Sequence, residues 1–275
     1  MVNKKAKAII RNWLPPAILN NIKNFKGSGV YFQGNYSNWQ TAANVCQGYD
    51  DKEILAKVLA STLKVKKGEA VYERDSVLFD HIEYTWPVTS GLMWAAARSG
   101  GRLNVLDFGG SLGSSYFQNR KFLQTIPELL WNVVEQPHYV EAGRSYIEDG
   151  HLHFYQNIDD CLKENNSNVV LLSSVLQYLQ EPFEILDKLL SSKIDTFIFD
   201  KTSYSKSSNV GLIKIQHVPE NIYKASYPCH FFIEKDVVNH IEDRGYKLIE
   251  EFKSLDELDP FAYWKGHIYL RTSDK

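Results

Sequence analysis

The sequence predicts an α/β fold in which a mostly parallel, seven-stranded sheet ends in an antiparallel hairpin and follows an N-terminal helical extension. After about residue 100, short apolar segments alternate with helical ones, which is typical of a parallel sheet with crossover helices. Near the end of the chain, two strand-like segments follow one another without a helix between them. The first hundred residues instead place apolar side chains mostly at helical spacing.

Residues 1–100 are expected to form a helical cap, and residues 101–275 a second unit that contains the sheet. Isoleucine, leucine and valine recur at helical spacing over residues 53–63, which predicts a helix there. The apolar run at 86–99 predicts a second packed helix. The stretch at 27–38 is rich in glycine, tyrosine and asparagine and predicts a loop.

The five parallel strands are predicted where short apolar runs lie between helical segments. These runs are residues 103–108, 131–135, 152–155, 169–173 and 195–200. A helix over 234–244 leads to two further strands, at 246–252 and 267–271, which we expect to pair antiparallel at one edge. Ligands of open α/β sheets bind beyond the carboxyl ends of the strands, so the functional residues are expected at those ends.

The most informative motif is LNVLDFGGSLGSS, residues 103–115, where the first strand runs into a glycine-rich turn. Glycine lets the backbone adopt positive φ angles and lie close to a ligand. The turn therefore predicts a small-cofactor site, with Gly109, Gly110, Ser111 and Gly113 as its expected contact residues.

Asp107 indicates which cofactor the turn binds. It lies two residues before the first glycine, where a dinucleotide-binding fingerprint has an apolar residue. A carboxylate that faced the pocket would repel a diphosphate and attract the ammonium group of an amino acid, which favours S-adenosyl-L-methionine. Glu135 ends the next strand, about 20 residues beyond the glycines, where an acid can bind ribose hydroxyls. Gln136 follows it and joins the predicted cofactor site.

Three further strand ends extend the predicted site. Asn157 follows the third strand, where the loop commonly contacts adenine in sheets of this layout, although it could equally cap the next helix. Ser173, Ser174 and Gln177 follow the fourth strand, where cofactor and acceptor would meet, but Gln177 could instead lie on a helix surface. The Asp-Lys pair at 200–201 ends the fifth strand, and it either contacts the acceptor or forms an ion pair.

The predicted catalytic residues are Arg74, Asp75, Tyr178 and His217. Three histidines, His81, His217 and His230, are candidate general bases on an acceptor hydroxyl, although a single histidine is more often structural. His217 is slightly favoured among them, because it lies in a loop expected after the fifth strand. Arg74 could hold an anionic acceptor, and Asp75 or Glu73 could act as the base; alternatively, these charges form an ion-paired helix start. Tyr178 follows the fourth strand, beside the expected acceptor.

Composition and charge argue against some classes of partner. The net charge of −2 argues against a general nucleic-acid binder. Three widely spaced cysteines without a C-x-x-C pair indicate neither a disulfide framework nor a zinc site, so a cytoplasmic location is expected and no metal is predicted. Residues 1–26 carry basic side chains without an acid, beside isoleucine, leucine and tryptophan. This stretch either binds weakly to an anionic membrane surface or packs on the body as a helical hairpin.

Six longer strings carry a resemblance to a known family: GNYSNWQTAANVCQGYD (34–50), VYERDSVLF (71–79), VLDFGGSLGSSYFQ (105–118), VVEQPHYVEAG (133–143), LLSSVLQYLQEP (171–182) and IYKASYPCHFF (222–232). With them the chain resembles S-adenosylmethionine-dependent methyltransferases that recur in bacterial surface-polysaccharide gene clusters. The resemblance implies a Rossmann-like class I methyltransferase fold. It also implies a cytoplasmic enzyme whose partner is a small-molecule or glycan-precursor acceptor. The methylated group would be a sugar, or a phosphate or phosphoramidate group attached to one. From the residues alone, an NAD-dependent sugar oxidoreductase and a noncatalytic cofactor- or glycan-binding subunit stay open.

Overall fold

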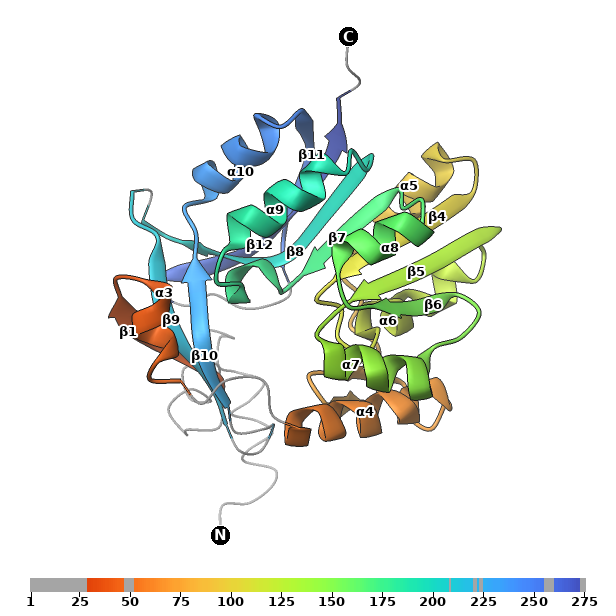
Figure 1. Ribbon diagram of the computed structural model, residues 1–275, viewed down its shortest axis with the longest axis horizontal. Helices are drawn as coiled ribbons and strands as arrows, with labels where there is room; N and C mark the ends of the chain where they lie inside the picture. The colour runs from red at the N-terminus through yellow and green to blue at the C-terminus, as the bar shows by residue number, and fades with distance from the viewer. Residues whose placement is uncertain are drawn as a thin grey trace, which may run out of the picture.

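The computed structural model describes residues 29–46, 52–207, 209–219, 222, 225–254 and 260–272. Its centre is a seven-stranded sheet with the strand order β11-β12-β8-β7-β4-β5-β6 (Figure 1). The five strands from β8 to β6 pair in parallel, whereas β12 pairs antiparallel with both β8 and β11. The predicted fold class, with its antiparallel terminal hairpin, is confirmed.

The strands of this sheet match the predicted segments and extend several of them. Their bounds are β4 Arg102–Phe108, β5 Glu128–Val134, β6 Leu152–Tyr155, β7 Val169–Ser173, β8 Thr196–Ser205, β11 Tyr246–Lys253 and β12 Ala262–Arg271. The largest extensions are in β8 and β12, because Tyr263 and Trp264 continue the ladder by pairing with Tyr204 and Ser203. All ten residues of β8 are buried, so this strand runs through the interior of the molecule.

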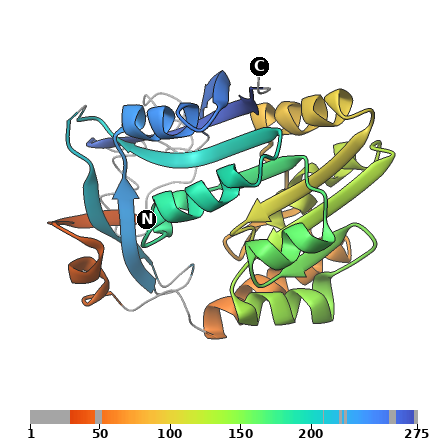
Figure 2. The same ribbon diagram turned by 45° about the horizontal axis from the view of Figure 1, so that its top comes forward.

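Helices cover both faces of the sheet (Figures 1 and 2). One face packs against α4 (Lys52–Lys66), α5 (Trp86–Arg98), α6 (Ser114–Leu123) and α7 (Pro137–Ala142), which η1 (Gly143–Ile147) continues. The other packs against α8 (Ile158–Glu164), α9 (Pro182–Ser191) and α10 (Glu234–Glu242), with η2 (Leu176–Tyr178) before α9. Successive strand residues point to opposite faces, so Val105 and Leu106 belong to different cores. The predicted helices over 53–63, 86–99 and 234–244 correspond to α4, α5 and α10.

A second, three-stranded antiparallel sheet lies beside the extended end of β8 (Figure 2). It consists of β1 (Tyr31–Tyr36), β9 (Leu212–Val218) and β10 (Ala225–Phe231), with β9 in the middle, and the short helix α3 (Trp39–Ala43) packs on it. The prediction of a loop over 27–38 is therefore wrong for β1. Glycine and polar residues hide the strand pattern there, and the pairing partner comes from a distant part of the chain.

The first hundred residues contain further β-structure that the sequence did not predict. The strands β2 (Tyr72–Arg74) and β3 (Val77–Phe79) form a hairpin, so this part is less helical than expected. Within the described residues, no helix is both long enough and apolar enough to cross a membrane. The basic stretch at 1–26, with its predicted membrane contact, lies outside the described residues.

Candidate functional site

A large cleft opens over the carboxyl ends of the parallel strands, where the topology predicts a ligand. Its volume is about 2130 Å³, and its walls are the turns after β4, β5 and β7, the β2–β3 hairpin and the β1-β9-β10 sheet. Twelve predicted site residues line it: Arg74, Asp75, Asp107, Gly109, Gly110, Ser111, Glu135, Gln136, Asn157, Ser173, Ser174 and Tyr178. Three others, Gly113, Gln177 and His217, are not among its lining residues.

Local geometry explains the glycines of the turn. Gly109 has a φ of +71°, and a Cβ atom there would clash with Val175. A Cβ atom on Gly110 would clash with the carboxyl group of Asp107. Gly113, with a φ of +89°, is the N-cap of α6. Gly109 and Gly110 therefore let Val175 and the Asp107 carboxyl lie against the turn, and both glycines line the cleft. Gly113 instead shapes the helix start and is not among the lining residues.

Asp107 is more deeply buried than expected. Only 1% of its surface is exposed, Oδ2 accepts a hydrogen bond from Trp131 Nε1 at 2.9 Å, and Oδ1 is buried without a partner in the described part of the chain. Burial raises the pKa of this carboxyl to about 7, against the lowering effect of the Trp131 hydrogen bond. Its charge is therefore partial at neutral pH and does not by itself exclude a diphosphate. Oδ1 nevertheless offers a buried acceptor to an N–H donor.

Glu135 lies immediately after β5, on the strand next to that of Asp107, as predicted. Its Oε1 accepts the backbone N–H of Gln136 at 3.1 Å, and the backbone of Ser111 provides a second hydrogen bond. Burial raises the pKa of Glu135, and these two bonds oppose that shift. The acid is thus held across the mouth of the glycine turn, where a ribose would lie in the predicted arrangement.

Asn157 lines the cleft and also caps α8. Its Oδ1 accepts the backbone N–H of Asp160 at 2.9 Å, which confirms the capping alternative. A contact between Asn157 and adenine stays a prediction.

The residues after β7 divide between ligand-facing and structural positions. Ser173 and Ser174 line the cleft, and Ser174 has a φ of +55°. Gln177 is wholly buried, and its Nε2 donates to the backbone carbonyl of Lys201 at 2.9 Å. It lies neither on a helix surface nor in the cleft wall. Contrary to the prediction of a cofactor contact, Gln177 fixes the backbone of β8.

His217 does not lie in the cleft wall, and it is not in a loop. It belongs to β9, where Gln216 and Val218 line the cleft and alternation turns His217 to the opposite face. There its ring stacks on Tyr31 of β1, with 4.7 Å between the ring centroids. This position contradicts the prediction that His217 is the general base. Pairing of β9 with β1, which joins distant parts of the chain, decides the orientation.

The charged cluster at 71–79 is a hairpin instead of a helix start. Asp75 and Ser76 form its turn, with φ angles of +51° and +67°. Arg74 and Asp75 both line the cleft, and the guanidinium of Arg74 lies 5.8 Å from the centre of the Phe79 ring. The hairpin thus presents a cation and an acid to the cleft, and their roles toward an acceptor stay predictions.

Glu73 is a stronger candidate base than Asp75. It lines the cleft with only 1% of its surface exposed. One carboxyl oxygen accepts the hydroxyl of Ser114 at the start of α6, and Oε2 is buried without a partner among the described residues. Burial raises the pKa of Glu73 to about 7. A carboxyl with this pKa can take up a proton near neutral pH, but the charge pattern of the hairpin did not reveal which acid is buried.

A hydrogen-bonded chain of Tyr178, Gln216 and Tyr227 forms the opposite wall. The hydroxyl of Tyr178 donates to Gln216 Oε1, and Gln216 Nε2 donates to the hydroxyl of Tyr227, both at 2.9 Å. The two tyrosine rings meet edge to face at 5.2 Å. Sequence reasoning missed Gln216 and Tyr227, although the alternation in LIKIQHV could have revealed the strand. Aromatic rings with polar tips suit a hydroxylated acceptor.

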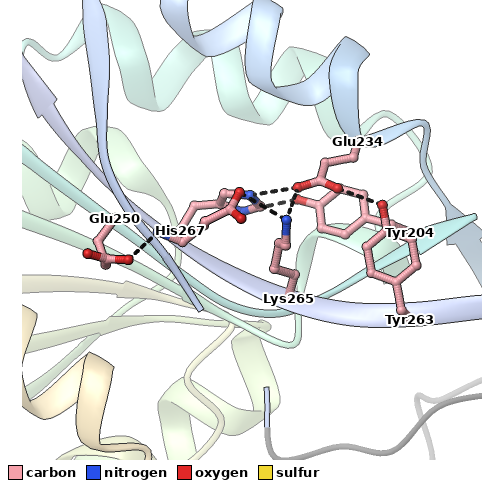
Figure 3. Close-up of polar contacts among 7 residues, drawn as sticks. Tyr204, Glu234, Glu250, Tyr263, Lys265 and His267 are labelled. Carbon is pink, nitrogen blue, oxygen red and sulfur yellow. Dashed lines mark hydrogen bonds and ion pairs between the residues drawn. The ribbon is translucent and has the colours of Figure 1, made fainter. Parts of the chain in front are cut away.

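A charged network supports this side of the cleft (Figure 3). Lys265 Nζ bonds Glu234 at 2.7 Å and Glu251 at 2.9 Å, while Tyr263 donates to Glu234 at 2.6 Å. Hydrogen bonding, chiefly with His267, lowers the pKa of Glu234 to about 2. Glu234, Glu251 and His267 offer ligand atoms within 4.8 Å of one another, but the Lys265 ammonium already bonds both carboxylates. The group is therefore an ion-pair network that ties α10 to β11 and β12.

No family model and no curated protein matches this chain. Among solved structures it is similar to the N-terminal domain of EvdMO1, determined in the presence of SAH and D-fucose, with 14% identity over 82% of this chain and 98% of that one and a TM-score of 0.48. The magnesium protoporphyrin IX methyltransferase ChlM from Synechocystis PCC 6803, with bound SAM, is 14% identical over 82% and 99%, with a TM-score of 0.44.

An S-adenosylmethionine-dependent methyltransferase from Clostridium acetobutylicum ATCC 824 is 9% identical over 67% of this chain and 91% of that one, with a TM-score of 0.43. At this level of similarity, these structures do not decide what the chain binds.

Proposed function

We propose that the protein is an S-adenosylmethionine-dependent methyltransferase. Its acceptor is a sugar, or a phosphate or phosphoramidate group attached to one, in bacterial surface-polysaccharide synthesis in the cytoplasm. One observation carries the proposal: the glycine turn after β4 lines the cleft beside two carboxyl groups from adjacent strands, the buried Asp107 and the half-buried Glu135. The resemblance in sequence supports the acceptor class.

The residues of the cleft fit this cofactor. Glu135 would accept the ribose hydroxyls, and the backbone at Gly109 and Gly110 would lie against the methionyl part. The buried Oδ1 of Asp107 would accept a hydrogen bond from the ammonium group. When bound, S-adenosylmethionine supplies an electrophilic methyl group on a positively charged sulfur.

The remaining residues of the cleft would prepare the acceptor. A sugar hydroxyl loses its proton as the new C–O bond forms, and Glu73 is the group we assign to receive that proton. A phosphate or phosphoramidate oxygen is already anionic and would need only orientation. Tyr178, Gln216 and Tyr227 would hold the acceptor by hydrogen bonds in either case, because methyl transfer depends on alignment of the reacting atoms.

Binding of S-adenosylhomocysteine, measured by calorimetry, tests the proposal. Glu135→Ala should weaken binding roughly 10- to 100-fold, because hydrogen bonds to a charged group contribute about 1.5–3 kcal/mol. Glu128→Ala is the matched control, since Glu128 is exposed at the opposite end of the same strand. Absence of binding to the intact protein would refute the proposal. Equal loss in the two variants would refute the role of Glu135.

Because Asp107 is buried, a second candidate function stays open, that of an NAD-dependent sugar oxidoreductase. A carboxyl with a pKa of about 7 repels a diphosphate less than a full charge would. Fluorescence titration with NADH distinguishes the two, because a methyltransferase should leave the NADH signal unchanged. A noncatalytic subunit would bind S-adenosylmethionine without ever releasing S-adenosylhomocysteine.

A further inference from the structure

Lys201 is a buried cation in the wall of the cleft. It lies in β8, with only 9% of its surface exposed, and it lines the cleft. Within the described part of the chain, no carboxylate pairs with its Nζ. The neighbouring Asp200 instead accepts the hydroxyls of Ser173 and Ser254, at 3.3 and 3.4 Å. Burial of an ammonium without a counter-ion is costly, so a ligand that brought an anion here would gain binding energy.

The backbone holds Lys201 in an unfavourable conformation. Its φ is +53°, in the left-handed region that few residues other than glycine adopt. Its N–H donates to Ser254 Oγ at 3.0 Å, and its carbonyl accepts Gln177 Nε2 at 2.9 Å. Side chains from two separate segments thus fix both backbone groups of one lysine. Local strain that the surroundings maintain is common at ligand-binding positions.

Further cations lie at this end of the cleft, and the acids of the cofactor site lie at the other. Lys206 follows β8 and Lys253 ends β11, and both line the cleft. Asp107 lies near the end of β4, which β7 separates from β8. Lys201 is therefore two strand spacings, about 10 Å, from the strand that carries Asp107. An anion at Lys201 would accordingly lie apart from the glycine turn, beside the wall that carries Tyr178 and Gln216.

We infer that Lys201 binds an anionic oxygen group, a phosphoryl or carboxylate, carried by the acceptor. The acceptor is then an acidic sugar derivative, whose hydroxyls meet Tyr178 and Gln216 next to Lys201. The inference rests on the proposed function, because it assigns the anion to the acceptor of that reaction. It narrows the acceptor class from sugars in general to negatively charged ones.

Calorimetry on the full-length protein saturated with S-adenosylhomocysteine tests the inference. The titrants are glucose 1-phosphate, glucuronate and neutral glucose. At least one anionic sugar should bind more tightly than glucose, and its affinity should fall with added salt. Whichever of glucose 1-phosphate and glucuronate binds more tightly identifies the anionic group as phosphoryl or carboxylate. Equal affinities for all three sugars, or no binding of either anionic sugar, would overturn the inference.

Three variants test whether the Lys201 side chain is what binds the anionic sugar. Lys201→Met should weaken the anionic probe at least tenfold, and Lys201→Arg should retain most of the affinity. Lys193→Met is the matched control, because Lys193 also has a positive φ, of +60°, but is exposed outside the cleft. Unchanged affinity in Lys201→Met would overturn the inference. So would loss of S-adenosylhomocysteine binding in a folded Lys201→Met protein, since Lys201 would then serve the cofactor.

The failure of the proposed function is distinguishable from the failure of this inference. If the intact protein does not bind S-adenosylhomocysteine, the methyltransferase proposal fails. The same titrations without S-adenosylhomocysteine then still report whether Lys201 binds an anionic sugar.

Discussion

Replacing Glu73 by glutamine should change how the stability of the protein depends on pH. Burial raises the pKa of this carboxyl from 4.5 to about 7, so the folded chain binds a proton that the unfolded chain has already released. The stabilising contribution is complete below pH 4.5 and is lost as the pH rises through about 7. At about 1.4 kcal/mol for each unit of pKa difference, Glu73 should lower the free energy of unfolding by about 3 kcal/mol between pH 4 and pH 8. Glutamine keeps the shape of the side chain and should remove this pH-dependent loss of stability, because it does not ionise.

Urea unfolding at pH 4, 5, 6, 7 and 8 measures the effect. The difference in unfolding free energy between Glu73→Gln and the unmodified protein should grow by about 3 kcal/mol across this range, in favour of the variant at high pH. Glu69→Gln, at an exposed position four residues earlier in the sequence, controls for the loss of one acid. Parallel pH profiles for Glu73→Gln and the unmodified protein would show that burial does not raise the pKa of Glu73, and the reasoning would be wrong.

Two further substitutions test the geometry of the site. Gly110→Ala should weaken S-adenosylhomocysteine binding at least tenfold, because the new Cβ clashes with the buried carboxyl of Asp107. Gly100→Ala, at a φ of +66° but in open space, should destabilise the fold slightly and leave that affinity unchanged, so equal effects would refute the clash. His217→Ala should change kcat for methyl transfer by less than about twofold. It should lower the free energy of unfolding by about 1 kcal/mol, because the stacking of the His217 ring on Tyr31 is lost. A kcat more than tenfold lower would restore His217 as a candidate base.

The amino-acid sequence by itself determined the central sheet and the place of its ligand site. Apolar runs marked β4 to β8, helical spacing marked α4, α5 and α10, and the lack of a helix between β11 and β12 marked the antiparallel edge. The glycine turn could also be predicted from the sequence, because the positive φ angles that require glycine arise among residues that are neighbours in the chain. Each of these signals is local: hydrophobic periodicity and turn chemistry depend on residues a few positions apart.

Only the tertiary structure decided which side chains enter the cleft and in what state. Pairing of β9 with β1 and β10 turned Gln216 inward and His217 outward, although the two are neighbours in the chain. Burial between layers raised the pKa values of Asp107 and Glu73. Burial also left Lys201 in the cleft wall, where none of the carboxylates in the described residues pairs with it. Desolvation and strand pairing come from segments far apart in sequence, and no local pattern records them.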